Sequence, residues 1–509
     1  MNAGIVGRAG LVLGPLLAAA CYFALPLEYT DAAGKAVTFT HAGRATLAMM
    51  VWMAVWWMTE AVEIEVTSLL PILAFPLLGV MPLAATTANY GADVIFLFLG
   101  GFVLALAIQR WGLDHRIAFL TLRLVGSRPA AVVAGCMGAT AFLSMWVSNT
   151  ATAAMMVPIA LSVVDLQLER RTGKTLRELG GIPQENVDER NFALSLLLCI
   201  AYAASIGGVA TIIGTPPNGI LVRFMAQTYG VEVSFASWML VGVPLTLVFL
   251  PLAWWVTTRL LFPTRIGEIE GGREYVDAEY RKLGPLNPGE RATLAVFAVT
   301  AFLWIFRPLL AQIEVGGVAP LKHLSDTGIA VAAAIALFLF PLDRPKRLFV
   351  MDWATAIKLP WGVLILFGGG LALAAATEAN GVAAFIGSYA RGFGGWPMLA
   401  VIAAVVAITV FLSEFTSNTA QVATMLPILA ALAPVLGVPP ALLLLPCTLA
   451  ASLAFMMPVG TPPNAIVFGT GLVTIPQMIR AGFVLNLAGI VIVTAFAWLV
   501  IGPVLAARQ

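Results

Sequence analysis

Charged residues are scarce in this sequence. Only 11% of its 509 residues are Asp, Glu, Lys or Arg, whereas a soluble domain carries about 25%. The mean hydropathy is +0.94, and a net charge of +2 provides no strongly basic surface for a nucleic-acid partner. These values exclude a soluble enzyme and predict an integral membrane protein.

Side chains that commonly carry catalysis or bind metals are also scarce. The chain has four cysteines without CxxC spacing, and we expect them to pack among apolar residues rather than to form disulfides or metal sites. No P-loop motif is present, which argues against ATP hydrolysis by this chain. An intramembrane hydrolase needs a nucleophile beside a base, and His41, His115 and His323 all lie near expected loops.

Long apolar runs dominate the remaining sequence. Their length of about 17–25 residues is that of a bilayer-spanning helix, so we predict an all-α polytopic membrane protein with eleven spans. The expected spans are 9–26, 45–61, 66–82, 93–111, 193–228 (interrupted), 238–261, 291–309, 326–341, 360–379, 440–476 (interrupted) and 482–505. Because many spans follow the first one, we expect it to be an uncleaved helix rather than a signal peptide.

Two further apolar segments, 129–164 and 396–436, each contain Ser-Asn-Thr. Starting at Ser148 and at Ser417, eight of thirteen positions are identical at an offset of 269. Each segment would be longer than about 50 Å as one straight helix, whereas the hydrocarbon core is about 30 Å thick. We therefore expect each segment to be broken at its Ser-Asn-Thr motif.

The Lys and Arg residues predict the orientation. With the N-terminus in the cytoplasm and the C-terminus outside, about 21 of the 28 Lys and Arg residues are cytoplasmic, in agreement with the positive-inside rule. Both flanks of 129–164 are then cytoplasmic, and both flanks of 396–436 are outside. We predict two opposed re-entrant hairpins, with irregular backbone at membrane depth held against protein or a water-filled cavity.

The two halves also resemble each other outside the hairpins. GGFVLALAIQRWG, from Gly100, resembles GGLALAAATEANG, from Gly369, and GTPPN occurs at 214–218 and 460–464. Such duplication with opposite orientation is typical of the inverted repeats of secondary transporters. We expect the charged insert 165–191 to be a solvated cytoplasmic helix and loop.

The inverted repeat predicts four parts of the chain. They are scaffold helices in 1–126, a transport part in 127–265, a cytoplasmic linker with scaffold helices in 266–390, and a second transport part in 391–509. Opposed hairpins favour alternating access over the continuous pore that an ion channel needs.

The repeated motifs have the chemistry of an ion-binding site. At a broken helix, the free N–H groups and positive dipole end of the second half bind anions, especially carboxylates. The unpaired carbonyls of the first half, together with Ser and Asn oxygens, suit a hard cation such as Na⁺. In GTPPN, glycine permits unusual backbone angles and the prolines interrupt the helix.

Cationic side chains are missing from the motif segments, so helix dipoles, hydroxyls and amides would hold the anion. Glu414 is the exceptional carboxylate there, and either a structural role or a role in coupling remains open for it. Glu60, Glu63 and Glu65 are expected in a cytoplasmic loop rather than in a metal site.

Through its paired SNT and TPPN elements the chain resembles the divalent-anion:sodium symporter family over essentially its whole length. The resemblance implies eleven spanning helices, two opposed hairpins, a homodimer in the lipid bilayer and an elevator motion. It also implies Na⁺-coupled import of C4-dicarboxylates such as succinate, malate and fumarate across the inner membrane. Citrate or sulfate transport and sodium-independent exchange are the alternatives within the family.

The resemblance also implies a set of site residues by motif. At least two Na⁺ sites are expected, one near Ser144, Ser148, Asn149 and Gly214 and one near Ser413, Thr416, Asn418 and Gly460. Substrate carboxylates are expected near Asn149, Thr150, Thr215, Asn418, Thr419, Thr461 and Pro462. Ser413 keeps the hydroxyl of a threonine found in some relatives, and Thr416 replaces a small residue, so only its carbonyl is expected to matter.

Overall fold

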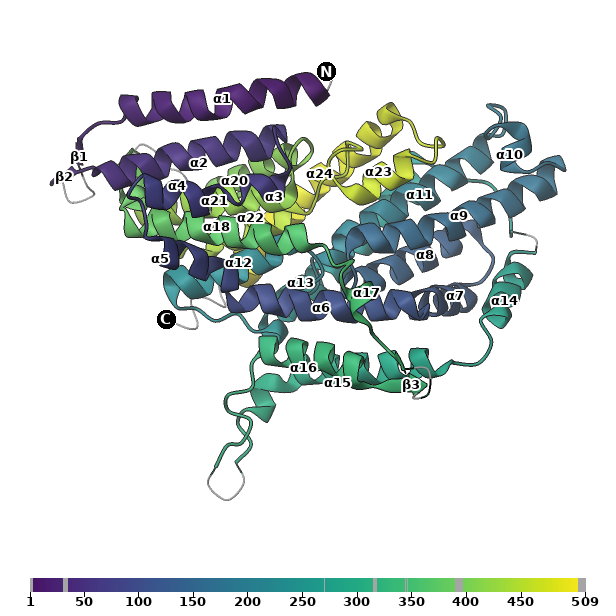
Figure 1. Ribbon diagram of the computed structural model, residues 1–509. Coiled ribbons are helices and arrows are strands. Elements are labelled where there is room, and N and C mark those ends of the chain that lie inside the picture. Colours follow the sequence, from purple (N-terminus) through teal and green to yellow (C-terminus); the bar gives the residue numbers. More distant parts are fainter. Residues whose placement is uncertain are drawn as a thin grey trace.

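The structure, a computed structural model, describes residues 3–501 apart from 31–34, 270, 315–317, 344, 346 and 390–396. These described residues form an almost entirely helical protein (Figure 1). Among them, nine helices are long and apolar enough to cross a membrane by length and composition. The prediction of an all-α polytopic membrane protein is confirmed.

The first half of the chain contains the helices up to residue 261. They are α1 (Ala3–Ala24), α2 (His41–Thr59), α3 (Ile64–Thr67), α4 (Leu70–Leu77), α5 (Leu83–Ala88), the 3₁₀ turn η1 (Asn89–Gly91), α6 (Asp93–Arg110), α7 (Leu113–Val125), α8 (Pro129–Ser144), α9 (Asn149–Thr172), α10 (Leu176–Leu179), α11 (Val187–Gly208), α12 (Pro216–Tyr229), α13 (Phe235–Trp255) and its π-helical continuation η2 (Val256–Leu261).

The second half follows the same plan. Its helices are α14 (Gly272–Lys282), α15 (Pro288–Leu310), α16 (Asp326–Leu339), α17 (Trp353–Ala356), α18 (Trp361–Ala379), α19 (Val382–Tyr389), α20 (Met398–Ser413), α21 (Asn418–Val435), α22 (Ala441–Ala451), α23 (Pro462–Phe468), α24 (Ile475–Phe496) and the π-helical η4 (Ala497–Ile501).

Two short antiparallel ribbons connect helices. The strands β1 (Glu28–Thr30) and β2 (Ala36–Thr38) pair with Glu28 opposite Thr38. The strands β3 (Pro341–Asp343) and β4 (Leu348–Phe349) pair with Pro341 opposite Phe349 and contain an irregularity in register.

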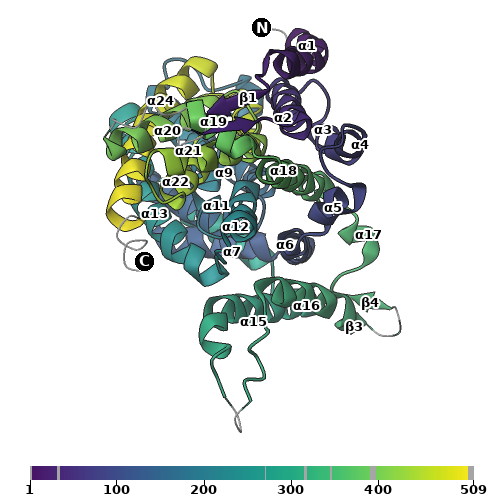
Figure 2. The same ribbon diagram turned by 90° about the vertical axis from the view of Figure 1, so that its left-hand side faces the viewer.

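The most buried part of the molecule is built around α11. In its most apolar window, 94% of the residues are buried, whereas only 17% are buried in the corresponding windows of α1 and α15. Figure 2 shows α15 and α16 at one side of the main helical body. The apolar side chains of α1 and α15 therefore face outward, as expected for helices in contact with lipid or another subunit.

The inverted repeat is visible in corresponding helices. The run from α6 to α9 corresponds to the run from α18 to α21 at the offset of 269. A Cβ on Gly100 would lie 2.5 Å from the backbone of Ala330 in α16, and one on Gly369 would lie 2.5 Å from the backbone oxygen of Ser68. The equivalent glycines thus permit equivalent close helix contacts in the two halves.

The expected single span 66–82 is wrong in detail, because α3 and α4 are separate helices. Pro71 lies in the first turn of α4, and a proline ring clashes with the carbonyl four residues earlier. The hydroxyl of Tyr90 donates to the free backbone oxygen of Ser68. The break therefore has both a local cause and a tertiary partner.

The expected boundary between the last two spans is also wrong. Span 440–476 ends earlier, at Phe468, and the last long helix begins at Ile475 rather than at 482. Pro476 occupies the first turn of that helix, and a capping box between Thr474 and Gln477 precedes it. Proline at this position starts a helix rather than ending one.

Some predictions fall partly outside the described residues. The boundary at 390 and 391, the last residues of the expected span 482–505, and the C-terminus belong to this group. Within the described residues, the insert 165–191 consists of the end of α9, the short α10, a loop and the start of α11. The prediction of a helix and loop there is confirmed.

Candidate functional site

Both hairpins break over four residues, at 145–148 and 414–417, which are equivalent at the offset of 269. Ser148 and Ser417 then cap the second helices. Their side-chain oxygens accept hydrogen bonds from the N–H groups three residues later, at 3.3 and 3.5 Å. Because the serines are the capping residues, the side chains of Asn149 and Asn418 do not serve as N-caps.

The interrupted helices also match each other closely. Thr215 and Thr461 are the N-cap residues of α12 and α23, with φ and ψ of −146° and 140° and of −145° and 149°. The prolines of GTPPN follow in the first turn, where the missing N–H leaves no hydrogen bond unmade. The unwound backbone therefore precedes the prolines and includes Gly214 and Gly460.

Two asparagines close these unwound segments. The side-chain nitrogens of Asn218 and Asn464 each donate to the carbonyl oxygens ten and seven residues earlier. The distances are 3.2 and 2.7 Å for Asn218, and both are 3.0 Å for Asn464. The same pair of bonds in both halves holds each loop in the same shape.

The motif-bearing helices of the two halves pack against each other. The α9 and α11 helices of the first half contact α23 of the second half, and α12 contacts α21 and α22. Figure 1 shows α23, in yellow, beside α11. This packing places motif helices of one half against motif helices of the other.

A first group of oxygens surrounds Asn149. One end of its amide lies 2.5 Å from Ser144 Oγ, 3.1 Å from Ala204 O and 3.3 Å from Gly214 O. With its nitrogen at this end, the amide donates to these acceptors, and this orientation satisfies both amide atoms without an ion. With its oxygen there, four oxygens face one another, an arrangement that suits a hard cation.

A second group of oxygens lies at the other hairpin. Ser413 Oγ is 2.8 Å from both Thr409 O and Gln421 Oε1. Thr416 Oγ1 is 2.9 Å from Leu412 O and 3.4 Å from Gln421 Oε1. The side-chain hydroxyl of Thr416 therefore takes part in this group, in addition to the backbone carbonyl expected from the sequence.

The expected substrate residues line the start of the motif helices. Thr150 and Pro462 are exposed, Asn149, Asn418 and Thr419 are half-buried, and Thr215 and Thr461 are buried. The N-terminal ends of α9, α12 and α21 present backbone N–H groups and the positive ends of helix dipoles, which attract carboxylates. No Lys, Arg or His occurs in 129–164 or 396–436, so no positively charged side chain of these segments binds the anion in addition to the dipoles.

Glu414 is buried and fully engaged. Its carboxylate accepts backbone hydrogen bonds of 2.8–3.0 Å from Phe455, Met456 and Met457 and one of 2.6 Å from Asn486 Nδ2. A Cβ on Gly460 would lie 3.1 Å from the same carboxylate. These bonds tie the second hairpin to the unwound segment before α23 and favour the structural role.

Sequence reasoning missed three groups of site residues. Asn218 and Asn464 are the last letters of GTPPN, so their position in the repeated motif was the available signal. Gln421 stands where the first hairpin has Thr152. This difference indicates a role for Gln421 only once its side-chain contacts are known. Asn486 lies in α24, outside every repeated motif, and the sequence carried no signal for it.

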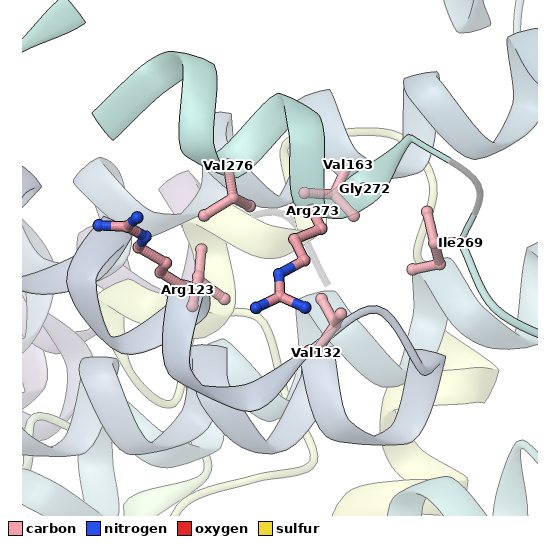
Figure 3. Close-up of a pocket in the computed structure, with 9 residues that line it drawn as sticks. Arg123, Val132, Val163, Ile269, Gly272, Arg273 and Val276 are labelled. Carbon is pink, nitrogen blue, oxygen red and sulfur yellow. The ribbon is translucent and has the colours of Figure 1, made fainter. Parts of the chain in front are cut away.

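Two cavities lie away from the motifs. A small one of about 20 Å³ is lined by residues that include Arg123, Val132 and Arg273 (Figure 3). A larger, open one of about 450 Å³ lies between α9, the region of α10 and residues 470–472. Both are on the side expected to be cytoplasmic, and neither includes a motif residue.

Known sequences support the assignment of this chain to a transporter family. A family profile described as "Sodium:sulfate symporter transmembrane region" matches residues 35–505. The sodium-dependent dicarboxylate transporter SdcS of Staphylococcus saprophyticus is 40% identical over 503 residues, covering 97% of this chain and 92% of the relative. SdcS of Staphylococcus aureus strain USA300 is 39% identical over 501 residues, covering 97% and 91%.

Solved structures support the fold. The YdaH transporter of Alcanivorax borkumensis superimposes with a TM-score of 0.60 at 13% identity, covering 98% of this chain and 99% of that one. MtrF of Neisseria gonorrhoeae gives a TM-score of 0.58 at 12% identity, covering 98% and 94%. At such low identity these likenesses concern the fold alone.

Proposed function

The chain belongs to the sodium:sulfate symporter family, and on that premise we propose that it imports C4-dicarboxylates such as succinate, malate and fumarate together with Na⁺. The observation that carries this proposal is the packing of motif helices from the two halves against each other. Oxygen groups suited to Na⁺ lie at Ser144 and Asn149 and at Ser413 and Thr416. Helix N-termini suited to carboxylates begin beside them.

Two Na⁺ sites support coupling through electrostatics. A dianion near uncharged amides, hydroxyls and helix dipoles binds weakly unless its charge is neutralised nearby. Two Na⁺ ions beside it supply two positive charges, and they leave again when the site opens to a solution poor in Na⁺. We propose that Gly214 and Gly460 contribute backbone oxygens to these sites, and that Ser148 contributes its carbonyl, since its hydroxyl caps α9.

The proposed movement is an elevator. In this proposal the transport parts 127–265 and 391–509 move across the bilayer against scaffold parts 1–126 and 266–390. The packing of α9 against α23 and of α12 against α21 supports a transport unit made from both halves. The chain would lie in the inner membrane with its N-terminus in the cytoplasm and its C-terminus outside.

In this proposal two protomers form a homodimer through their scaffold helices, and this dimer is the fixed support for the movement. Single cysteines at exposed Val299 in α15 and at exposed Thr150 at the hairpin tip, in a cysteine-free background, test the division. A scan of scaffold positions such as Val299 should yield crosslinked dimers, and Thr150 should not. Crosslinks found only at the hairpin tip would overturn the division.

The transport proposal is tested by uptake of labelled anions into proteoliposomes loaded without anion. We expect succinate uptake from Na⁺ medium, with a sigmoidal dependence on Na⁺ concentration, and little uptake from choline medium. Labelled citrate and sulfate serve as the competing substrates. Equal uptake in Na⁺ and choline would reject symport, and preferred uptake of citrate or sulfate would reassign the substrate.

A further inference from the structure

Gln421 is a buried amide beside the second hairpin tip, and its orientation is fixed. It lies one turn into α21 and is 1% exposed. Its Nε2 donates to Thr409 O at 2.9 Å, so its Oε1 must face Ser413 Oγ and Thr416 Oγ1 at 2.8 and 3.4 Å. Turning the amide over would place its oxygen against the carbonyl of Thr409.

The hydroxyl protons at this place are too few for all the acceptors. A hydroxyl has one hydrogen to donate. Thr416 has a closer acceptor in Leu412 O at 2.9 Å, the bond that Ser and Thr commonly make within a helix. Ser413 has two acceptors at the same distance of 2.8 Å, Thr409 O and Gln421 Oε1.

The hydroxyl of Ser413 can therefore rotate between two states. When it donates to Gln421 Oε1, the amide is satisfied without any ion. When it donates to Thr409 O, three side-chain oxygens, those of Ser413, Thr416 and Gln421, face one another without a hydrogen. A hard cation between them would stabilise such a group, because oxygen atoms are its preferred ligands.

A further oxygen of the same hairpin also lacks a partner. Asn418 Oδ1 is buried and, within the described part of the chain, has no hydrogen-bond partner. In the first hairpin, Asn149 itself contacts the equivalent serine, Ser144. In the second hairpin Gln421 takes that contact, which leaves the oxygen of Asn418 available.

We propose that Gln421 Oε1 is a ligand of the second Na⁺ site, which becomes available when the Ser413 hydroxyl turns to Thr409 O. The proposal rests on the Na⁺ coupling proposed above and makes the two Na⁺ sites chemically different. The first is built around Asn149. The second adds Gln421. The equivalent residue of the first hairpin is Thr152, whose side chain is too short to reach the same place.

The test compares Gln421→Met, which removes the oxygen at similar length, with Gln421→Glu, which keeps an oxygen and adds charge. The readout is the Na⁺ concentration that gives half-maximal thermal stabilisation of the purified protein without anion. We expect Gln421→Met to raise this concentration about tenfold or more and Gln421→Glu to leave it unchanged or lower it. Thr152→Val is the matched control, because the buried Thr152 hydroxyl has no partner among the described residues, and it should behave as wild type.

The two variants also separate a ligand from a purely structural amide. Both lose the N–H bond to Thr409 O, and Glu also turns a carboxylate oxygen toward that carbonyl, so a structural role predicts at least as much damage from Glu as from Met. Weakening in Gln421→Glu that equals or exceeds that in Gln421→Met, or wild-type Na⁺ dependence in Gln421→Met, would overturn the proposal. If Gln421→Met does not fold, Gln421→Thr replaces it, with the same expected loss. A wild-type protein that Na⁺ stabilises no more than choline would instead reject the proposed Na⁺ coupling itself.

Discussion

At the scale of single residues, the number of donor hydrogens relative to acceptor atoms determines what the motifs can bind. Asn218 and Asn464 each donate both amide hydrogens to backbone carbonyls. Glu414 accepts hydrogen bonds from four residues. These bonds shape the loops and use the amide hydrogens, whereas Oδ1 of Asn218 and of Asn464 has no hydrogen-bond partner among the described residues. Ser413 and Gln421 have more acceptors than hydrogens around them, and so do Ser144 and Asn149 when the Asn149 oxygen faces Gly214 O. We take this property as the mark of a cation site.

The paired asparagines give a prediction about the loops. Asn218→Asp and Asn464→Asp each replace two donors with a carboxylate oxygen that faces two carbonyls. Since a buried polar group left without its partner costs about 1–3 kcal/mol, both variants should lower the melting temperature and weaken Na⁺ binding to a similar degree. Thermal unfolding with and without Na⁺ measures both effects.

Asn191→Asp provides the matched control for these variants. It also breaks an amide bond to a carbonyl, that of Pro263 at 2.7 Å, but at a half-buried position outside the GTPPN loops. It should leave Na⁺ binding unchanged. A loss in Asn191→Asp as large as in the buried pair would mean that the loop shape is not the cause.

At the scale of elements, the site depends on how closely the end of α11 approaches the start of α9. A Cβ on Gly208 would lie 2.5 Å from Asn149 Oδ1, so only glycine leaves room for the amide. The Asn149 side chain can rotate away from such a Cβ without a change in the backbone. The contact therefore affects ion binding more than folding.

Gly208→Ala should accordingly fold but lose Na⁺-dependent stabilisation. Gly138→Ala is the control on the neighbouring α8, because a Cβ there meets nothing within 4 Å among the described atoms. Alanine is the better helix former by about 1 kcal/mol, so this control should be as stable as wild type or more so. Normal Na⁺ binding in Gly208→Ala, measured by thermal shift, would show that the approach of the two helices is not needed.

The sequence predicts some elements well and others poorly, for physical reasons. The broken hairpins follow from apolar length against bilayer thickness and from a repeated motif, so both breaks could be placed at Ser-Asn-Thr. The expected span 66–82 and the boundary between 440–476 and 482–505 were wrong, because a proline such as Pro71 or Pro476 can interrupt a span or begin a helix and the flanking residues decide which. The role of Gln421 could not be predicted, since it depends on which neighbours its amide meets in three dimensions.

At the scale of the whole molecule, the repeat places motif helices of the two halves side by side. Each half supplies one hairpin and one interrupted helix, and the contacts of α9 with α23 and of α12 with α21 cross between the halves. A single half would leave α9 without its contact with α23 and α12 without its contact with α21. The central claim is that two motifs 269 residues apart build one site.

The pair Asn149→Ala and Asn418→Ala tests this claim most directly. If both amides serve one site, each variant should fold normally and yet lose thermal stabilisation by Na⁺ with succinate. The loss of a charge-assisted hydrogen bond of about 1.5–3 kcal/mol lowers affinity roughly ten- to hundredfold, and lost cation contacts add to it. Asn191→Ala should keep the wild-type response. Wild-type stabilisation by Na⁺ with succinate in both Asn149→Ala and Asn418→Ala would contradict the shared site.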